Sequence, residues 1–338
     1  MRAALATFLA EATGARSAAV KELRLLPNGA VQENWLVASA FEGGTLDGEQ
    51  RLVLRTNAAT ALGIGLGRTE EFAVQRAVYR AGVAAAEPLV LCASAAVIGR
   101  PFYVMRWLPG EAAGARIAAG ELGGDRDRLL ARLAAELARL HAIRPTFAAL
   151  SCLGAPPADP ARHRLDQQER LLAEDADPHP VAAWGIRWLR CHLPRAVPPV
   201  LCHGDFRTGN FLADAEGLVA VLDWEFAAWS DPAEDLGWFC LGCWRFGADA
   251  QEAGGIGRRD VFYRAYAQAS GRSVDPERVR WWEVMAALRW LVLALRQRDR
   301  CLIGGEPSLD LALTGRRPSE CELEILKLTG VRGDARPS

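Results

Sequence analysis

Residues 201–238 read LCHGDFRTGNFLADAEGLVAVLDWEFAAWSDPAEDLGW, and no other part of the chain says as much about its architecture. Within this stretch, four residues separate Asp205 from Asn210, and Asp223 comes thirteen residues after Asn210. An apolar run over 218–222 stands directly before Asp223. This run predicts a short buried strand that ends at Asp223.

The spacing of these three polar side chains suits phosphoryl transfer from ATP. One carboxylate must orient the acceptor hydroxyl and take its proton, while an asparagine oxygen and a second carboxylate hold Mg²⁺ against the nucleotide phosphates. A single aspartate in a glycine-containing turn is more often a turn or cap residue. The joint spacing and the apolar strand beside it favour the catalytic interpretation.

The same stretch resembles the aminoglycoside phosphotransferase and choline kinase superfamily, which shares the protein-kinase-like fold. HGDFRTGN matches the catalytic loop of that superfamily, and LDWE matches its metal motif. Within the superfamily the chain is most similar to bacterial phosphotransferases related to kinase domains fused to, or encoded beside, acyl-CoA dehydrogenases, through DPAEDLGWFCLGCWRFG and LALTGRRPSECELEILKL. The resemblance implies an α+β, bilobal, protein-kinase-like fold with a small antiparallel-sheet N-lobe and a larger, mainly helical C-lobe.

The resemblance also implies roles for individual residues. Asp205 would be the catalytic base, and Asn210 and Asp223 would be the Mg²⁺ ligands. Arg207 stands two residues after the base, where a guanidinium could stabilise developing negative charge. Glu225 either joins the metal ligands or pairs with an arginine, and the sequence leaves both interpretations open.

Two further positions match structural residues of the superfamily. Asp235 corresponds to an aspartate that braces the catalytic loop from the helix that follows. His203 corresponds to the leading histidine of the loop, which is usually structural.

The N-lobe lacks the lysine that protein kinases carry on their third strand. Lys21 and Lys327 are the only lysines of the chain, and the expected third strand, RLVLR, offers Arg55 instead. Arginine still supplies positive charge and forked donors for phosphate oxygens. Its acidic partner on the next helix would be Glu71, with Glu70 as the alternative. Arg55 could equally be an ordinary exposed strand arginine.

The remaining nucleotide contacts follow from the same fold. The turn at 28–30, together with Asn34, would lie over the phosphates, although its single glycine is weak evidence. The segment MRWLPG resembles the hinge between kinase lobes, and its backbone at Met105 and Trp107 would hydrogen-bond adenine. A plain linker between the lobes is compatible with the same position.

The sequence predicts two lobes, residues 1–107 and 108–338. Length alone favours two units, at about 150 residues each. Glycine- and proline-containing turns divide the N-lobe into helices at 1–16 and 69–81, with Thr69 as N-cap of the second, and strands at 20–26, 33–41, 51–55, 89–93 and 102–107. Apolar periodicity beyond Gly110 predicts mainly helices, one of them over 232–247.

The composition fits a folded protein with a large core, since 50% of the 338 residues are hydrophobic and 24% are charged. The formal net charge of −1 gives no basic excess for nucleic acid. No uninterrupted apolar stretch approaches the roughly 18 residues that a membrane span needs, and Glu11 interrupts the alanine-rich start that could imitate a signal peptide. Eight scattered cysteines suit a reducing cytoplasm, so we expect a cytoplasmic protein without nucleic-acid or membrane partners. The oligomeric state is not evident from the sequence.

Two motifs imitate other functions. The run GIGLG at 63–67 follows a strand and precedes a helix, but Arg68 stands where a dinucleotide fingerprint has its third glycine. We interpret it as a loop before the helix. Cys240 and Cys243 form a C-x-x-C pair without a second pair at zinc spacing, which favours buried thiols over a metal.

The acceptor is the least determined part of the prediction. No concentrated acidic run is present, and a polycationic aminoglycoside would favour an acidic pocket. The resemblance therefore suggests an ATP- and Mg²⁺-dependent kinase of a small hydroxylated metabolite, such as a hydroxyacyl-CoA or a hydroxy acid. The alternatives are an aminoglycoside kinase and a nucleotide-binding pseudokinase. A protein kinase ranks last, because the chain has no DFG triplet, APE motif or activation segment.

Overall fold

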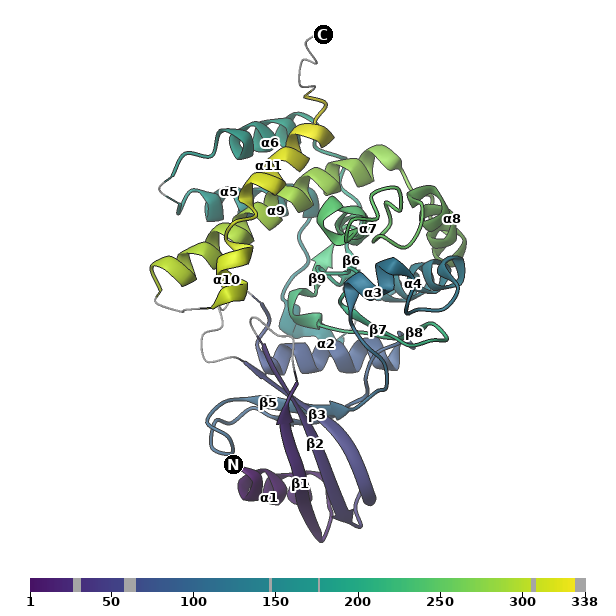
Figure 1. The fold of residues 1–338 in the computed structure, drawn as a ribbon, viewed down its shortest axis with the longest axis vertical. Helices are drawn as coiled ribbons and strands as arrows, with labels where there is room; N and C mark the ends of the chain where they lie inside the picture. Colours follow the sequence, from purple (N-terminus) through teal and green to yellow (C-terminus); the bar gives the residue numbers. More distant parts are fainter. Residues whose placement is uncertain (27–31, 58–64, 146–147, 176, 305–307, 332–338) are drawn as a thin grey trace.

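The computed structural model describes residues 1–26, 32–57, 65–145, 148–175, 177–304 and 308–331. A five-stranded sheet with one helix on its outer side forms one end of the molecule, and a larger group of helices forms the other (Figure 1). This arrangement confirms the expected α+β, bilobal, kinase-like fold. No helix in these ranges is long and apolar enough to span a membrane.

The sheet of the N-lobe is antiparallel throughout, with strand order β1-β2-β3-β5-β4. Its strands are β1 (Ser17–Leu25), β2 (Gln32–Glu42), β3 (Gly48–Asn57), β4 (Pro88–Cys92) and β5 (Phe102–Arg106). Helix α1 (Arg2–Thr13) ends earlier than expected, because Gly14 adopts a left-handed conformation at φ 67° and terminates the helix. Leu5 and Leu9 of α1 are fully buried in one apolar cluster with Leu52 and Leu54 of β3.

Helix α2 (Arg68–Arg80) covers the other face of the sheet and lies between the sheet and the C-lobe (Figure 1). The expected N-cap at Thr69 is wrong: the helix begins one residue earlier, with Gly67 in the cap position and no side-chain cap. Glu71 is fully buried on α2, and Arg55 is buried on β3. Alternation along β3 sends Leu54 toward α1, so Arg55 lies on the face toward α2.

The C-lobe contains nine α-helices among the described residues and two small two-stranded sheets. The sheets are β6 (Val200–Cys202) with β9 (Ala228–Ser230), and β7 (Phe211–Ala213) with β8 (Leu218–Val221). The helices are α3 (Gly114–Ala119), α4 (Arg126–Leu140), α5 (Pro160–Leu172), α6 (Pro180–Cys191), α7 (Pro232–Cys240), α8 (Arg259–Ser270), α9 (Pro276–Leu302), α10 (Leu309–Thr314) and α11 (Pro318–Leu328).

The single helix expected over 232–247 is wrong in its second half. Helix α7 ends at Cys240, Leu241 is extended at ψ 139°, and a short 3-10 turn follows over Gly242–Trp244. The break redirects the chain, so that the ring of Trp244 lies under the guanidinium of Arg207, with the guanidinium carbon 4.4 Å from the ring centroid.

Candidate active site

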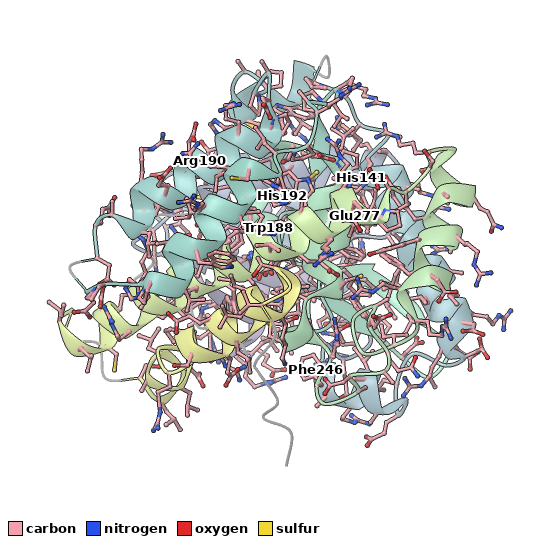
Figure 2. All side chains as sticks on the ribbon, turned by 90° about the horizontal axis from the view of Figure 1, so that it is seen from above. His141, Trp188, Arg190, His192, Phe246 and Glu277 are labelled. Atoms are coloured by element: carbon pink, nitrogen blue, oxygen red, sulfur yellow. The ribbon has the colours of Figure 1, made fainter. Side chains whose placement is uncertain are left out.

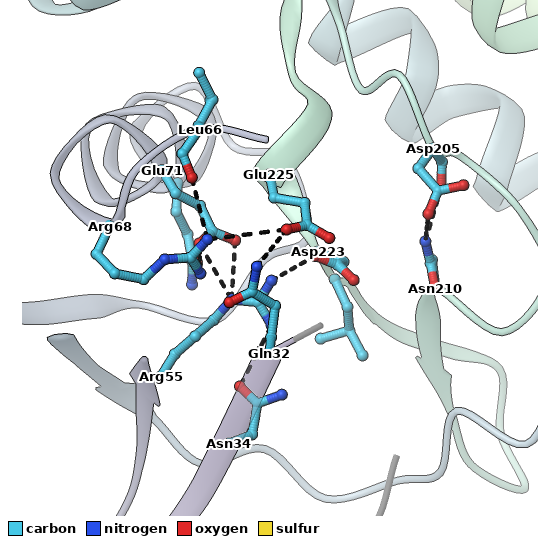
Figure 3. Close-up of polar contacts among 12 residues, drawn as sticks. Gln32, Asn34, Arg55, Leu66, Arg68, Glu71, Asp205, Asn210, Asp223 and Glu225 are labelled. Carbon is cyan, nitrogen blue, oxygen red and sulfur yellow. Dashed lines mark hydrogen bonds and ion pairs between the residues drawn. The ribbon is translucent and has the colours of Figure 1, made fainter. Parts of the chain in front are cut away.

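The loop between β6 and β7 presents the carboxylate of Asp205, which is buried. Its Oδ1 accepts hydrogen bonds from Trp238 Nε1 at 2.7 Å and from Arg207 Nε at 3.2 Å. Its Oδ2 accepts from Asn210 Nδ2 at 2.5 Å (Figure 3). Because the amide nitrogen of Asn210 faces Asp205, the amide oxygen points elsewhere and remains free to act as an oxygen ligand.

Asp235, in the first part of α7, braces this loop as expected. Its Oδ2 accepts from the backbone N–H of His203 at 2.7 Å, and its Oδ1 accepts from that of Gly204 at 2.8 Å. His141 Nε2 also lies 3.0 Å from Oδ2. Burial alone would raise the pKa of Asp235, but the hydrogen bonds from His141 and from the backbone N–H of His203 outweigh it, so the pKa is lowered.

His203 joins the catalytic loop to the proposed metal motif. Its Nε2 donates to the carbonyl of Leu222 at 2.8 Å, and its Nδ1 accepts from the backbone N–H of Asp205 at 3.2 Å. The two bonds require a neutral imidazole protonated at Nε2. Through this one ring, the backbone of Asp205 is held in register with the residue that precedes Asp223.

Asp223 follows β8 in a left-handed conformation, at φ 66° and ψ 71°. Non-glycine residues adopt this region at a cost of roughly 1–3 kcal/mol, and such strain collects at functional sites. The carboxylate accepts from Arg55 Nη2. Burial would raise the pKa of Asp223, but the charge of Arg55 prevails and lowers it. The side chain therefore stays ionised, as a metal ligand must.

Arg55 is the centre of the N-lobe half of the site (Figure 3). Its Nε donates to Glu71 Oε1 at 2.9 Å, and Nη1 lies 3.4 Å from the amide oxygen of Asn34, its cross-strand partner on β2. Burial would lower the pKa of Arg55, but the charges of Glu71 and Asp223 raise it well above its ordinary value. The structure thus brings together Arg55, Glu71, Asn34 and Asp223, and Glu71 rather than Glu70 is the helical partner.

Glu225 occupies the opposite side of Asp223 from the catalytic loop. Its Oε2 accepts from Gln32 Nε2 and lies 3.9 Å from Arg68 Nη2, so it has both an amide and an arginine near it. Its carbonyl accepts the N–H of Leu66 at 2.7 Å. Burial, with the negative charge of Asp223, raises the pKa of Glu225 to about 8. A carboxyl that holds its proton to this pH is a weak metal ligand.

The glycine run at 63–67 reaches Glu225 directly. Residues 63 and 64 lie outside the described ranges, but a Cβ on Gly65 would come within 3.1 Å of the Glu225 carbonyl oxygen and of its Oε2. The absent side chain at Gly65 therefore permits the loop to pack onto the metal motif. Nothing in the sequence indicates this contact, or the contacts of Gln32, Arg68 and Trp238 with the site, because each depends on tertiary packing.

The two hinge residues lie apart from this cluster. Met105 accepts a hydrogen bond on its sulfur from Gln75 Nε2 at 3.2 Å, and the N–H of Trp107 donates to the carbonyl of Arg51 at 3.2 Å. The guanidinium of Arg51 lies over the Trp107 ring, 4.1 Å from its centroid. Within the described parts of the chain, neither residue contacts the other predicted site residues. The turn at 28–30 lies outside the described residues.

The cysteine pair does not form a metal site in the part of the chain that the structure describes. Both thiols are free, and burial raises the pKa of Cys240 to about 12 and also raises that of Cys243. The thiolates that zinc requires are therefore disfavoured. The structure does gather His141, Cys202 and Asp235, but both ring nitrogens of His141 are already hydrogen-bonded.

A strained acid behind a short strand, a base on a braced loop and a strand arginine paired with a helix glutamate define a protein-kinase-like phosphotransferase. The chain belongs to the phosphotransferase enzyme family, whose profile matches residues 22–282. Enzymes of this class transfer phosphate to hydroxyl groups of small molecules. The expected superfamily is thereby confirmed.

Individual proteins show the same relationship. Mouse acyl-CoA dehydrogenase family member 10 is 30% identical over 196 residues, which is 57% of this chain but 18% of that protein. The chain thus spans about a fifth of that curated relative. A crystal structure of a putative aminoglycoside phosphotransferase from Ralstonia eutropha is 19% identical and covers 97% of this chain and 98% of its own, with a TM-score of 0.75. An aminoglycoside 2'-phosphotransferase in complex with GDP is 16% identical, covering 92% and 93%, with a TM-score of 0.58.

Proposed function

We propose that the chain transfers the γ-phosphoryl group of ATP, with Mg²⁺, to a hydroxyl group of a small metabolite. The observation that carries the proposal is the joint placement of Asp205, Asn210 and Asp223. Asn210 Nδ2 donates to Asp205 Oδ2 at 2.5 Å, and His203 links Asp205 to the residue before Asp223. Hydrogen bonds therefore join the chain segments that carry the three side chains that the chemistry needs.

In this proposal Asp205 accepts the proton of the acceptor hydroxyl as its oxygen attacks the γ-phosphorus. Trp238 and Arg207 both donate to Oδ1, so Oδ2 is the oxygen that would take the proton, in exchange for its bond to Asn210. General-base catalysis of this kind contributes typically 10²–10⁴-fold. The bond between the γ-phosphorus and the bridging oxygen of ADP breaks as the new oxygen–phosphorus bond forms.

The donor set fits Mg²⁺, which prefers oxygen ligands and is commonly held by one or two carboxylates plus substrate phosphates. Asn210 would offer its amide oxygen, and Asp223 the carboxylate oxygen that Arg55 does not engage. When bound, Mg²⁺ neutralises charge on the nucleotide phosphates. Arg55 and Arg207 would add positive charge at the phosphates from the N-lobe and from the catalytic loop.

The charges near Asp205 favour an anionic acceptor over a polycationic one. Arg207 contacts the base directly, and Arg289 lies behind it, donating to the Gly204 carbonyl and covering the Trp238 ring at 4.6 Å from its centroid. The charge of Arg289 is balanced by Glu234, 3.9 Å away, so the guanidinium that would repel an aminoglycoside at the base is that of Arg207. Together with the similarity to an acyl-CoA dehydrogenase family member, Arg207 supports a hydroxyacyl-CoA or a related hydroxy acid as acceptor.

The testing experiment measures ADP release from ATP and Mg²⁺ with separate panels of hydroxyacyl-CoAs, hydroxy acids and aminoglycosides. Asp205→Asn should abolish acceptor-dependent release while Mg²⁺-dependent ATP binding persists. Glu277→Gln, on an exposed turn of α9, is the matched control and should retain full activity. Full activity in Asp205→Asn would refute the assignment of the base. Binding of ATP without turnover on any panel would favour a pseudokinase, and turnover confined to aminoglycosides would refute the anionic acceptor.

A further inference from the structure

A cavity of about 370 Å³ opens in the C-lobe, away from the proposed active site. It lies at the far end of the β6–β9 sheet from the catalytic loop: Pro198 before β6 and Asp231 after β9 line it, whereas the loop leaves the other end of β6. Of the residues labelled in Figure 2, His141 contacts the lining residue Tyr266, and Glu277 directly precedes the lining residue Arg278. Its volume is within the usual range for small-molecule sites.

Half of the residues that line the cavity are apolar, and among the charged ones the arginines outnumber the aspartates. The apolar surface comes from residues such as Val197, Leu236 and Val279, and the arginines are Arg144 and Arg272, with Arg278 as a third. An apolar floor with a few convergent charged groups is the usual composition of a small-molecule site.

The carboxylate of Asp231 is already committed to its protein neighbours. Its Oδ2 accepts from Arg278 Nε at 2.8 Å and from Trp282 Nε1 at 3.0 Å, while Oδ1 accepts from the N–H of Ala233 at 2.9 Å. Asp231 therefore neutralises Arg278. The second acid of the lining, Asp275, caps α9 by accepting from the N–H of Glu277.

Arg144 and Arg272 have no such partner. Among the described residues neither forms an ion pair, and Arg272 reaches only the backbone carbonyl of His141, with Nη2 at 3.4 Å. Two guanidiniums without carboxylates thus face a cavity that also offers an apolar wall. Guanidiniums without a carboxylate partner in the protein can donate hydrogen bonds to the carboxylate or phosphate oxygens of a ligand.

A continuous chain of hydrogen bonds leads from the cavity to the catalytic loop. Tyr266, which lines the cavity, donates to His141 Nδ1 at 2.8 Å, and His141 Nε2 donates to Asp235 Oδ2 at 3.0 Å. Asp235 holds the N–H groups of His203 and Gly204, which directly precede Asp205. All five residues are buried, so each bond in the chain restrains the next.

We infer that this cavity binds a small organic anion, with an apolar body and one carboxylate or phosphate group, and that its occupancy is coupled to the catalytic loop through Tyr266, His141 and Asp235. An anion in the cavity that attracts the guanidinium of Arg272 would alter its contact with the backbone carbonyl of His141. His141 is the middle residue of this series of hydrogen bonds. The ligand acts as an effector, because the cavity and Asp205 lie at opposite ends of β6.

Binding is tested by calorimetry on the full chain with phenyl phosphate, hexanoate and inorganic phosphate, each in the presence of saturating ADP and Mg²⁺. The double variant Arg144→Gln/Arg272→Gln should weaken phenyl phosphate or hexanoate at least about tenfold, as expected for lost charge-assisted hydrogen bonds. Arg128→Gln, an exposed arginine of α4 outside the cavity, should bind as the wild type does. Equal affinity in the double variant, or binding of none of the probes, would overturn the site.

Coupling is tested by hydrogen exchange at the amides of His203 and Gly204. Saturating probe should slow their exchange in the wild type, and Tyr266→Phe should bind the probe but lose this response. If Tyr266→Phe does not fold, Arg272→Lys replaces it: lysine keeps the charge for binding but loses the Nη2 contact to the His141 carbonyl. Unchanged exchange in the saturated wild type would refute the coupling. Neither measurement depends on turnover, so failure of the proposed kinase activity would leave both results interpretable.

Discussion

Arg55 and Asp223 are in direct contact, although one lies on the central strand of the N-lobe sheet and the other follows a C-lobe strand. The same guanidinium donates to Glu71 on α2 through Nε at 2.9 Å. One side chain therefore joins β3, α2 and the proposed metal motif. This contact between the lobes depends on an arginine, whose separate nitrogens reach both carboxylates, whereas protein kinases carry a lysine with a single point of charge on the third strand.

Replacing Arg55 by methionine should lower the free energy of unfolding by about 3 kcal/mol, because it leaves the buried carboxylate of Glu71 and the partly buried carboxylate of Asp223 without the cation that they share. Urea denaturation at pH 7 measures the effect. Arg55→Lys keeps the charge but cannot reach Glu71 and Asp223 together, and it should recover only part of the loss. Wild-type stability in Arg55→Met would contradict the role of this contact.

Trp238→Phe should reduce kcat about tenfold while leaving KM for ATP unchanged, once an acceptor is identified. The ring is retained, but Asp205 Oδ1 loses the indole donor at 2.7 Å, which is worth roughly 1.5 kcal/mol as a bond to a charged group. Trp290→Phe is the matched control, since the Trp290 ring packs at a tilt against Trp244, with centroids 5.2 Å apart, and has no hydrogen bond to Asp205. Equal losses in both variants would indicate general damage to the aromatic cluster.

Gly204→Ala should destabilise the protein by about 3 kcal/mol or more. The residue has φ +76°, and a Cβ there would lie 2.3 Å from the carbonyl oxygen of Phe226. Gly14→Ala is the control for conformation alone, because its φ is +67° and nothing lies within 4 Å of the added carbon. That control should cost about 1 kcal/mol. Thermal unfolding of both variants compares the two costs.

Glu283 predicts a pH dependence of stability. Burial raises its pKa to about 7 in spite of the nearby charge of Arg259. The unfolded chain releases this proton near pH 4.5, whereas the folded protein retains it, so stability falls as the pH rises from 4.5 to 7 and levels off above. The loss amounts to at most about 3 kcal/mol.

Glu283→Gln should flatten this part of the stability profile, measured by urea denaturation between pH 5 and 8. Glu277→Gln on the same helix is exposed and should retain the wild-type slope. A wild-type slope in Glu283→Gln would show that another group titrates in this range.

The sequence predicted the elements whose signal is local and the residues that a resemblance could place. The pairing of Arg55 with Glu71 and the bracing role of Asp235 belong to this group. The prediction of Thr69 as the N-cap failed because Gly67 already supplies an extended residue before the helix. Helix propensity alone cannot choose between Gly67 and Thr69 as the cap. The prediction of one continuous helix over 232–247 failed after Cys240. There the packing of Trp244 under Arg207, a contact across 37 residues of sequence, overrides a continuous apolar pattern.

The contacts of Trp238 and Gln32 could not be predicted at all. An indole nitrogen reaches Asp205 only because α7 has one particular rotation against the loop, and Gln32 meets Glu225 only because the lobes close on each other. Periodicity places such residues on elements but does not orient those elements relative to one another.

The use of Arg55 in place of a lysine has a practical consequence for chemical labelling. Lys21 lies on the outer strand of the sheet, paired with Glu49, and Lys327 lies on α11, so the proposed site around Asp223 contains no lysine amine. Acyl-phosphate nucleotide probes and other amine-directed reagents would leave this site unmodified even when they bind there. Surveys that detect kinases by acylation of an active-site amine would therefore overlook this protein, and a guanidine-selective dicarbonyl is the reagent that the site would require.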